Sequence, residues 1–200
     1  MQAVETETLI LYHTDLRGEW PEEGARALAA RLPYAKRLAL GSASVRARES
    51  LAGIALALRA LAAVTRRDVR AGELLFADGA KPRLTSADGA PGGADFSIAH
   101  SAPFVGCAAL AGARVGLDIE VGGGAQLAGQ VAREAALKAA GLTLAAFPEV
   151  ELEADGARCR GEHWHAHALA EFPGACACLM TSRPVARIDS RPVALADLFR

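Results

Sequence analysis

Three short strand-like runs, separated by turn-forming residues, constrain the fold of this chain more than any other feature of its sequence. The runs cover residues 95–99, 104–109 and 115–120. Connections this short usually join antiparallel neighbours, so the runs predict an antiparallel meander. Residues 44–64, which precede them, carry apolar side chains on one helical stripe and predict an amphipathic helix.

The rest of the chain mixes both kinds of element. Residues 25–32, after an acidic first turn, and residues 126–140, closed by Gly141, predict two more helices. Further strand-like runs cover residues 8–13, 150–153, 163–169, 175–181 and 185–188. The glycines at 122–124 interrupt the pattern and predict a hinge. Sheet, helix and sheet in this order indicate an α+β protein.

Composition excludes several classes of protein. The 200 residues carry a net charge of −1, which gives no overall attraction to nucleic acid or to a membrane surface. No apolar stretch is long enough to span a bilayer, and the acidic start lacks the basic residues of a signal peptide. The four cysteines form no CxxC pair and do not resemble a disulfide framework. These features predict a reduced, cytoplasmic protein.

Two acidic residues end the third strand-like run. Alternate side chains of a strand share a face, so Asp118 and Glu120 point together, away from Val115, Leu117 and Ile119. Two adjacent carboxylates favour a cation between them, and Mg²⁺ prefers such oxygen ligands. The alternative is a solvated strand face that happens to end in acids.

The helix at 126–140 adds further charged groups. Glu134 and Lys138 are four residues apart and share a face, and Arg133 is adjacent. Glu134 could be a third metal ligand or a general base, with Lys138 and Arg133 as phosphate contacts. An ordinary surface Glu–Lys pair is the alternative interpretation. His100, at the end of a strand, and Lys81, in a turn, are single basic residues that could also contact a ligand.

Four ordered motifs together resemble the 4′-phosphopantetheinyl transferase superfamily. They are Gly79-Ala80-Lys81-Pro82, Phe96-Ser97-Ile98-Ala99-His100-Ser101, Val115-Gly116-Leu117-Asp118-Ile119-Glu120, and Arg133-Glu134-Ala135-Ala136-Leu137-Lys138-Ala139-Ala140-Gly141. The family has a gKP turn, an SHS strand end, a (V/I)G(V/I)D-x-E strand and a K-E-A-x-x-K-x-x-G helix. Here Arg133 replaces the family lysine, Ala99 replaces a frequent serine, and only thirteen residues separate Glu120 from Glu134.

The resemblance implies a function and a fold. The enzymes move the phosphopantetheine arm of coenzyme A to a serine of an acyl or peptidyl carrier protein, with Mg²⁺, and release adenosine 3′,5′-bisphosphate. The implied α+β monomer has two pseudo-related lobes, each with a small antiparallel sheet and a long helix. We expect the lobes at residues 1–121 and 122–200.

The resemblance also implies roles for single residues. Asp118, Glu120 and Glu134 would hold Mg²⁺, and Glu134 would also accept the serine proton. The residues implied to contact the phosphates of coenzyme A are Lys138 and Arg133 at the pyrophosphate, and Lys81, His100 and Arg48 at the 3′-phosphate.

Two other functions fit parts of the sequence. A non-catalytic relative could bind coenzyme A or a carrier protein without transferring the arm. The short segment between Glu120 and Glu134 is the feature that motivates this alternative. A zinc-binding module could use three alternate histidines with two downstream cysteines: His163, His165, His167, Cys176 and Cys178. A serine nucleophile is disfavoured because no G-x-S-x-G elbow occurs.

Overall fold

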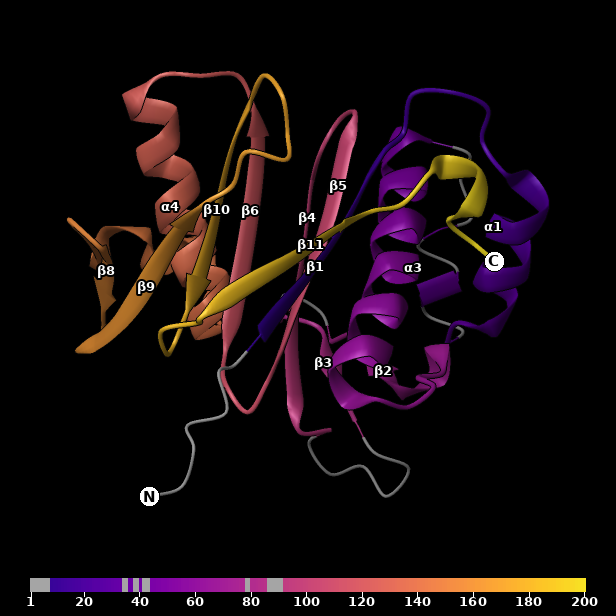
Figure 1. Cartoon of the computed structure of the whole chain (residues 1–200), viewed down its shortest axis with the longest axis horizontal. Helices are drawn as coiled ribbons and strands as arrows, with labels where there is room; N and C mark the ends of the chain where they lie inside the picture. The colour runs from indigo at the N-terminus through magenta and orange to yellow at the C-terminus, as the bar shows by residue number, and fades with distance from the viewer. Residues whose placement is uncertain (1–7, 34–35, 38–39, 41–43, 78–79, 86–91) are drawn as a thin grey trace.

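The computed structural model describes residues 8–33, 36–37, 40, 44–77, 80–85 and 92–200, and it is mixed α+β as the sequence predicts. Two long helices lie outside two sheets (Figure 1), in the order α3, first sheet, second sheet, α4. Helix α3 spans Val45–Thr65 and α4 spans Ala125–Ala140. Both helices are therefore where the sequence predicts them.

The first sheet contains strands from both ends of the described chain. Its order is β11-β1-β5-β4, with β11 parallel to β1 and the other neighbours antiparallel. The strands are β1 (Thr8–Asp15), β4 (Ala94–Ser101), β5 (Phe104–Ala111) and β11 (Arg187–Pro192).

The second sheet is antiparallel throughout, in the order β6-β10-β9-β8-β7. Its strands are β6 (Val115–Val121), β7 (Val150–Glu153), β8 (Gly156–Cys159), β9 (Glu162–Ala168) and β10 (Ala175–Thr181). Smaller elements are α1 (Glu22–Arg31), the β2–β3 pair (Leu74–Leu75, Arg83–Leu84) and 3₁₀ turns at Ala71–Glu73, Leu144–Glu149 and Leu195–Asp197.

The predicted three-stranded meander is wrong in its third strand. Strands β4 and β5 pair as expected, but β6 pairs with β10 of the second sheet rather than with β5. Alternation along β6 shows which side chains share a face, but it does not identify the strand that accepts its hydrogen bonds. In the same way β11 covers Arg187–Pro192, later than the predicted residues 185–188, and pairs with the distant β1.

Three apolar layers hold the four structural layers together. One lies between α3 and the first sheet, a second lies between the sheets, and a third lies between the second sheet and α4. Leu117 and Ile119 of β6 belong to the layer between the sheets. The intervening residues of β6 therefore face α4.

Gly116 allows α4 to lie directly against β6. A Cβ atom built at this position would be 2.0 Å from the carbonyl oxygen of Ala135 and 2.4 Å from the backbone nitrogen of Ala139. No side chain fits in that space, so the glycine fixes the close approach of strand and helix. Gly141 ends α4 in the left-handed conformation, with φ of 71°, as the sequence predicts.

Side chains of β4 cover the open edge of β6. Asp95, Ser97 and Ser101 accept hydrogen bonds from the backbone N–H groups of Val115, Leu117 and Val121, at 2.8, 3.0 and 3.1 Å. Every second residue of β4 thus faces β6, while the others face α3. We call these three side-chain bonds the β4–β6 ladder. Within the described residues, the ladder connects the edge strands of two sheets that are not paired with each other.

The expected division at residues 121 and 122 stays a prediction. Strand β6, before this point, is hydrogen-bonded to the second sheet, and β11, after it, is hydrogen-bonded to the first. Each sheet packs against one long helix, the first against α3 and the second against α4. Within the described residues, no helix has both the length and the hydropathy that crossing a bilayer requires.

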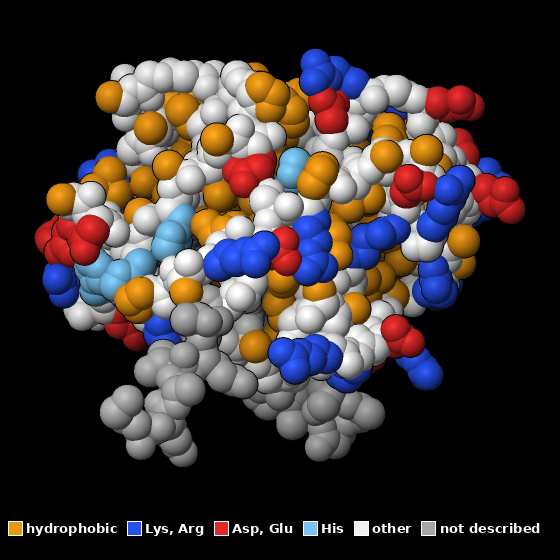
Figure 2. Space-filling model, in the orientation of Figure 1, with side chains coloured by type: hydrophobic (Ala, Val, Ile, Leu, Met, Phe, Trp, Pro, Cys, Tyr) orange, Lys and Arg blue, Asp and Glu red, His pale blue; other side chains and the backbone are white. Residues whose placement is uncertain are grey.

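Charges of both signs are mixed on the face that Figure 2 shows. Basic side chains lie on either side of an acidic one across the middle of this face, over β11. Strand β11 carries Arg187, Asp189 and Arg191, and Arg191 pairs with Asp189 at 2.6 Å.

Candidate functional site

Asp118 and Glu120 lie on the face of β6 that α4 covers, together with Gly116. Their neighbours across the β6–β10 pairing are Cys178 and Cys176. Because Gly116 brings α4 close, the α4 side chains that face β6 lie over these two acids. Glu134 and Lys138 are those side chains.

Asp118 is a buried carboxylate with one unsatisfied oxygen. Its side chain is 5% exposed, and its Oδ1 accepts from Lys138 Nζ at 2.6 Å. Its Oδ2 has no hydrogen-bond partner among the residues that the structure describes. Burial raises the pKa of Asp118, while Lys138 lowers it and Glu120 raises it further. A buried carboxylate oxygen without a partner is costly, and a ligand at that oxygen would remove the cost.

Glu134 lies within the electrostatic reach of both acids of β6. Burial raises its pKa first, the charge on Asp118 raises it further, and Glu120 adds to the effect; Lys138 acts in the opposite direction. The fold therefore places three carboxylates within electrostatic reach of one another, and Lys138 pairs with one of them, Asp118. Carboxylates that raise one another's pKa in this way favour a cation between them.

Glu120 is held from the first sheet. Ser101 Oγ donates to Glu120 Oε2 at 3.0 Å and accepts from the Val121 N–H. The exposed carboxylate of Glu120 is thus tied to the end of β4, whereas Asp118 is tied to α4.

His100 points to the opposite side of β4 from Ser101. Its Nδ1 lies 3.4 Å from Glu49 Oε2 on α3, and its ring is 40% exposed. Glu49 is buried. This pairing engages Nδ1 of His100 and leaves Nε2 as the ring nitrogen that could meet an anion.

Lys81 and His100 are not brought together. Lys81 pairs with Asp95 and donates to the Val115 carbonyl oxygen at 2.6 Å. Asp95 and His100 are five residues apart on β4, which is roughly 16 Å at about 3.3 Å per residue. Burial lowers the pKa of Lys81, and Asp95 raises it. Lys81 thus joins the β4–β6 ladder at the end far from His100.

Arg133 and Arg48 also have partners away from the acids. Arg133 donates to the Val150 carbonyl oxygen at 3.2 Å and lies over the ring of Phe147. Arg48 lies 3.7 Å from Glu22 and over the ring of Trp20. A phosphate contact from either residue requires a change of rotamer.

The donor set at Asp118, Glu120 and Glu134 suits Mg²⁺. Carboxylate oxygens are the ligands this ion prefers, and Asp118 already has a free buried oxygen. The ligand atoms of the three acids are not all within 4.8 Å of one another. An ion must therefore draw Glu134 and Glu120 inward.

The zinc-module interpretation fails on geometry. His167 and His165 pair with Leu179 and Thr181 of β10 and share their face, which is turned toward the first sheet. Cys178 belongs to the layer under α4, on the opposite face. Side chains on opposite faces of one sheet cannot surround one tetrahedral ion.

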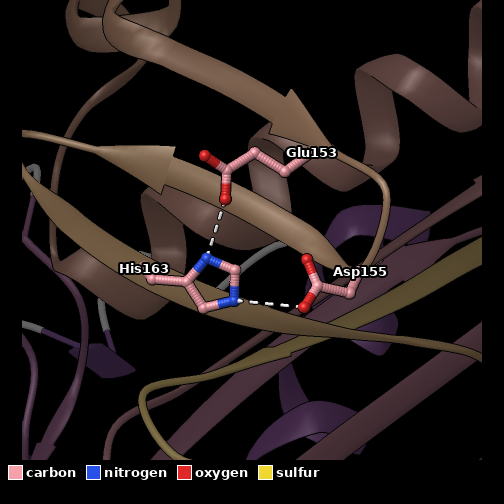
Figure 3. Close-up of side chains that lie close together, drawn as sticks. All are labelled: Glu153, Asp155 and His163. Carbon is pink, nitrogen blue, oxygen red and sulfur yellow. Dashed lines mark hydrogen bonds and ion pairs between the residues drawn. The ribbon is translucent and has the colours of Figure 1, made fainter.

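A separate charged group lies at the β7–β8 turn (Figure 3). His163 lies between two carboxylates, with Nδ1 2.8 Å from Glu153 and Nε2 3.9 Å from Asp155. Within the described part of the chain, these three residues bring their ligand atoms within 4.8 Å of one another. The imidazole lies between the two acids and is hydrogen-bonded to Glu153.

A pocket of about 660 Å³ lies at the Val115 end of β6, near the end of α4. Lys81, Arg83 and Arg114 line it. Asp118 is three residues farther along β6, roughly 10 Å away at about 3.3 Å per residue. This pocket is therefore distinct from the group of acids.

Two residues of the site received no role from the sequence. Glu49 is a charged residue on the buried face of α3. A charged residue at such a position is the sequence feature that could have indicated a role. Ser101 is part of the SHS-like motif, but only the structure shows that it faces Glu120.

Comparison of the sequence with protein-family models and with curated proteins returns no match to either.

Proposed function

We propose that this chain is a Mg²⁺-dependent 4′-phosphopantetheinyl transferase. It would move the phosphopantetheine arm of coenzyme A to a serine of an acyl or peptidyl carrier protein. The observation that carries the proposal is the group formed by Asp118, Glu120 and Glu134, in which Asp118 pairs with Lys138 and has one buried oxygen without a partner among the described residues. The two sheet-and-helix halves would be the two lobes of that fold.

The three carboxylates would hold the ion, and each is already supported by its own element. When bound, Mg²⁺ supplies positive charge against the pyrophosphate of coenzyme A. Lys138 adds a second positive charge at the same place. His100, backed by Glu49, would bind the 3′-phosphate through Nε2.

Glu134 is the proposed proton acceptor. Burial and the neighbouring acids raise its pKa, so it is a stronger base than an exposed glutamate. The serine oxygen attacks the β-phosphorus, and the bond from that phosphorus to the bridging oxygen breaks. Adenosine 3′,5′-bisphosphate leaves with the electron pair, and the serine proton passes to Glu134 directly or through water.

Mass spectrometry of carrier proteins tests the proposal. Several apo carriers, incubated with coenzyme A, Mg²⁺ and the protein, should include at least one that gains the phosphopantetheine mass. Glu134→Gln and Asp118→Asn should abolish the gain, whereas Glu151→Gln, at an exposed glutamate of β7, should not. Coenzyme A binding without mass gain on any carrier would instead favour a non-catalytic relative.

A further inference from the structure

We propose that Ser101 is a positioning residue that orients Glu120 for the divalent cation. The inference rests on the proposed function, because it assumes that Glu120 is a ligand. Ser101 acts through Glu120 and touches neither substrate nor ion.

The hydrogen-bond pattern fixes the direction of the serine hydroxyl. The Val121 N–H supplies its own hydrogen to Ser101 Oγ at 3.1 Å. The single hydroxyl hydrogen is therefore left for the carboxylate, and Glu120 Oε2 lies 3.0 Å away. One oxygen of Glu120 is held by this bond, and the other remains for an ion.

Glu120 needs such a support more than Asp118 does. Asp118 is buried and bonded to Lys138, whereas Glu120 is an exposed glutamate near the end of β6. A free glutamate side chain samples several rotamers, and each lost rotamer has an entropic cost on binding. A fixed second partner lowers that cost, as outer-shell partners do at metal sites.

The β4–β6 ladder provides a matched control. Ser97 makes the same kind of bond, to the Leu117 N–H at 3.0 Å, and Leu117 carries no carboxylate. Loss of Ser97 Oγ thus removes a rung of the ladder and leaves Glu120 untouched. A purely structural role for Ser101 would make the two serines equivalent.

The experiment measures Mg²⁺ affinity of the full chain by calorimetric titration, without substrate. Ser101→Ala should weaken Mg²⁺ binding by about 10–100-fold, the range for loss of an outer-shell partner. Ser101→Thr, which keeps the hydroxyl, should restore most of the affinity. Ser97→Ala should lower the metal-free melting temperature but leave Mg²⁺ affinity close to that of the wild type.

The possible failures are distinguishable. Wild-type protein that binds no Mg²⁺ would overturn both this inference and the proposed function. Mg²⁺ binding that Ser101→Ala leaves unchanged, or that Ser97→Ala weakens equally, would overturn the positioning role alone. A carrier-modification assay run with saturating Mg²⁺ supplies the second readout, since Ser101→Ala should regain activity there.

Discussion

Gly116→Ala should destabilise the protein and disable the group of acids at the same time. The new Cβ would be 2.0 Å from the carbonyl oxygen of Ala135, whereas ordinary contacts begin at 3.4 Å. The strand and the helix must therefore separate by about 1.4 Å, the difference between these distances. The Ala135 oxygen and the Ala139 nitrogen that the new Cβ would meet are both backbone atoms, so rotation of a side chain cannot relieve the overlap with them.

The expected size of the effect follows from that displacement. Overpacking of this kind costs about 1–3 kcal/mol, and the rigid backbone on both sides favours the upper value. For a chain of this length, about 3 kcal/mol lowers the melting temperature by roughly 6–12 °C. The same shift would lengthen the 2.6 Å Lys138–Asp118 contact beyond hydrogen-bonding distance. A misplacement of about 1 Å can reduce a reaction rate by roughly 10²-fold.

Thermal unfolding with and without Mg²⁺ measures both effects. Gly72→Ala is the control, because a Cβ there meets no atom within 4 Å; we expect a change within about 0.5 kcal/mol. The reasoning is refuted if Gly116→Ala melts like the wild type. It is also refuted if the variant keeps the full Mg²⁺-induced stabilisation.

Three further predictions concern residues around the site and in the second sheet. Glu49→Gln should weaken coenzyme A binding but not Mg²⁺ binding, because the carboxylate that faces Nδ1 of His100 becomes a neutral amide; equal loss of both would contradict this. Lys81→Met should cost about 2 kcal/mol in denaturant unfolding, through its lost charged hydrogen bonds, and change coenzyme A affinity little. Burial, and next the charge of His165, lowers the pKa of His167, so the unfolded chain binds this proton more tightly. The free energy of unfolding should thus fall as pH drops below 6.5, and His167→Gln should reduce that fall in urea titrations across this range. An unchanged slope in the variant would count against a half-buried His167 with a lowered pKa.

Local pattern was enough to predict most elements and the element faces that carry the two pairs of candidate site residues. The stripe of α3, the Gly141 cap of α4 and the alternation of β6 each depend on neighbours along the chain. Alternation placed Asp118 and Glu120 on one face, and four-residue spacing placed Glu134 with Lys138. These features repeat locally, so sequence alone resolves them.

Pairing between distant segments could not be predicted in the same way. The change of β6 to the second sheet depends on β10, more than fifty residues later, and the sequence of β6 suits either partner. The ladder from Ser97 and Ser101 needs β4 and β6 to be edge to edge, which no spacing reveals. The family resemblance implies one phosphate site for Lys81 and His100. In the structure the two residues lie near opposite ends of β4, and no local sequence pattern reveals that separation.

The proposed function depends on one divalent cation bound by Asp118, Glu120 and Glu134. A crystal structure with Mn²⁺ and coenzyme A, recorded near the manganese absorption edge, locates the ion directly. We predict one anomalous peak between these three carboxylates, in contact with the pyrophosphate. A peak found instead only at Glu153, Asp155 and His163, or coenzyme A bound away from α4 and β6, would contradict it.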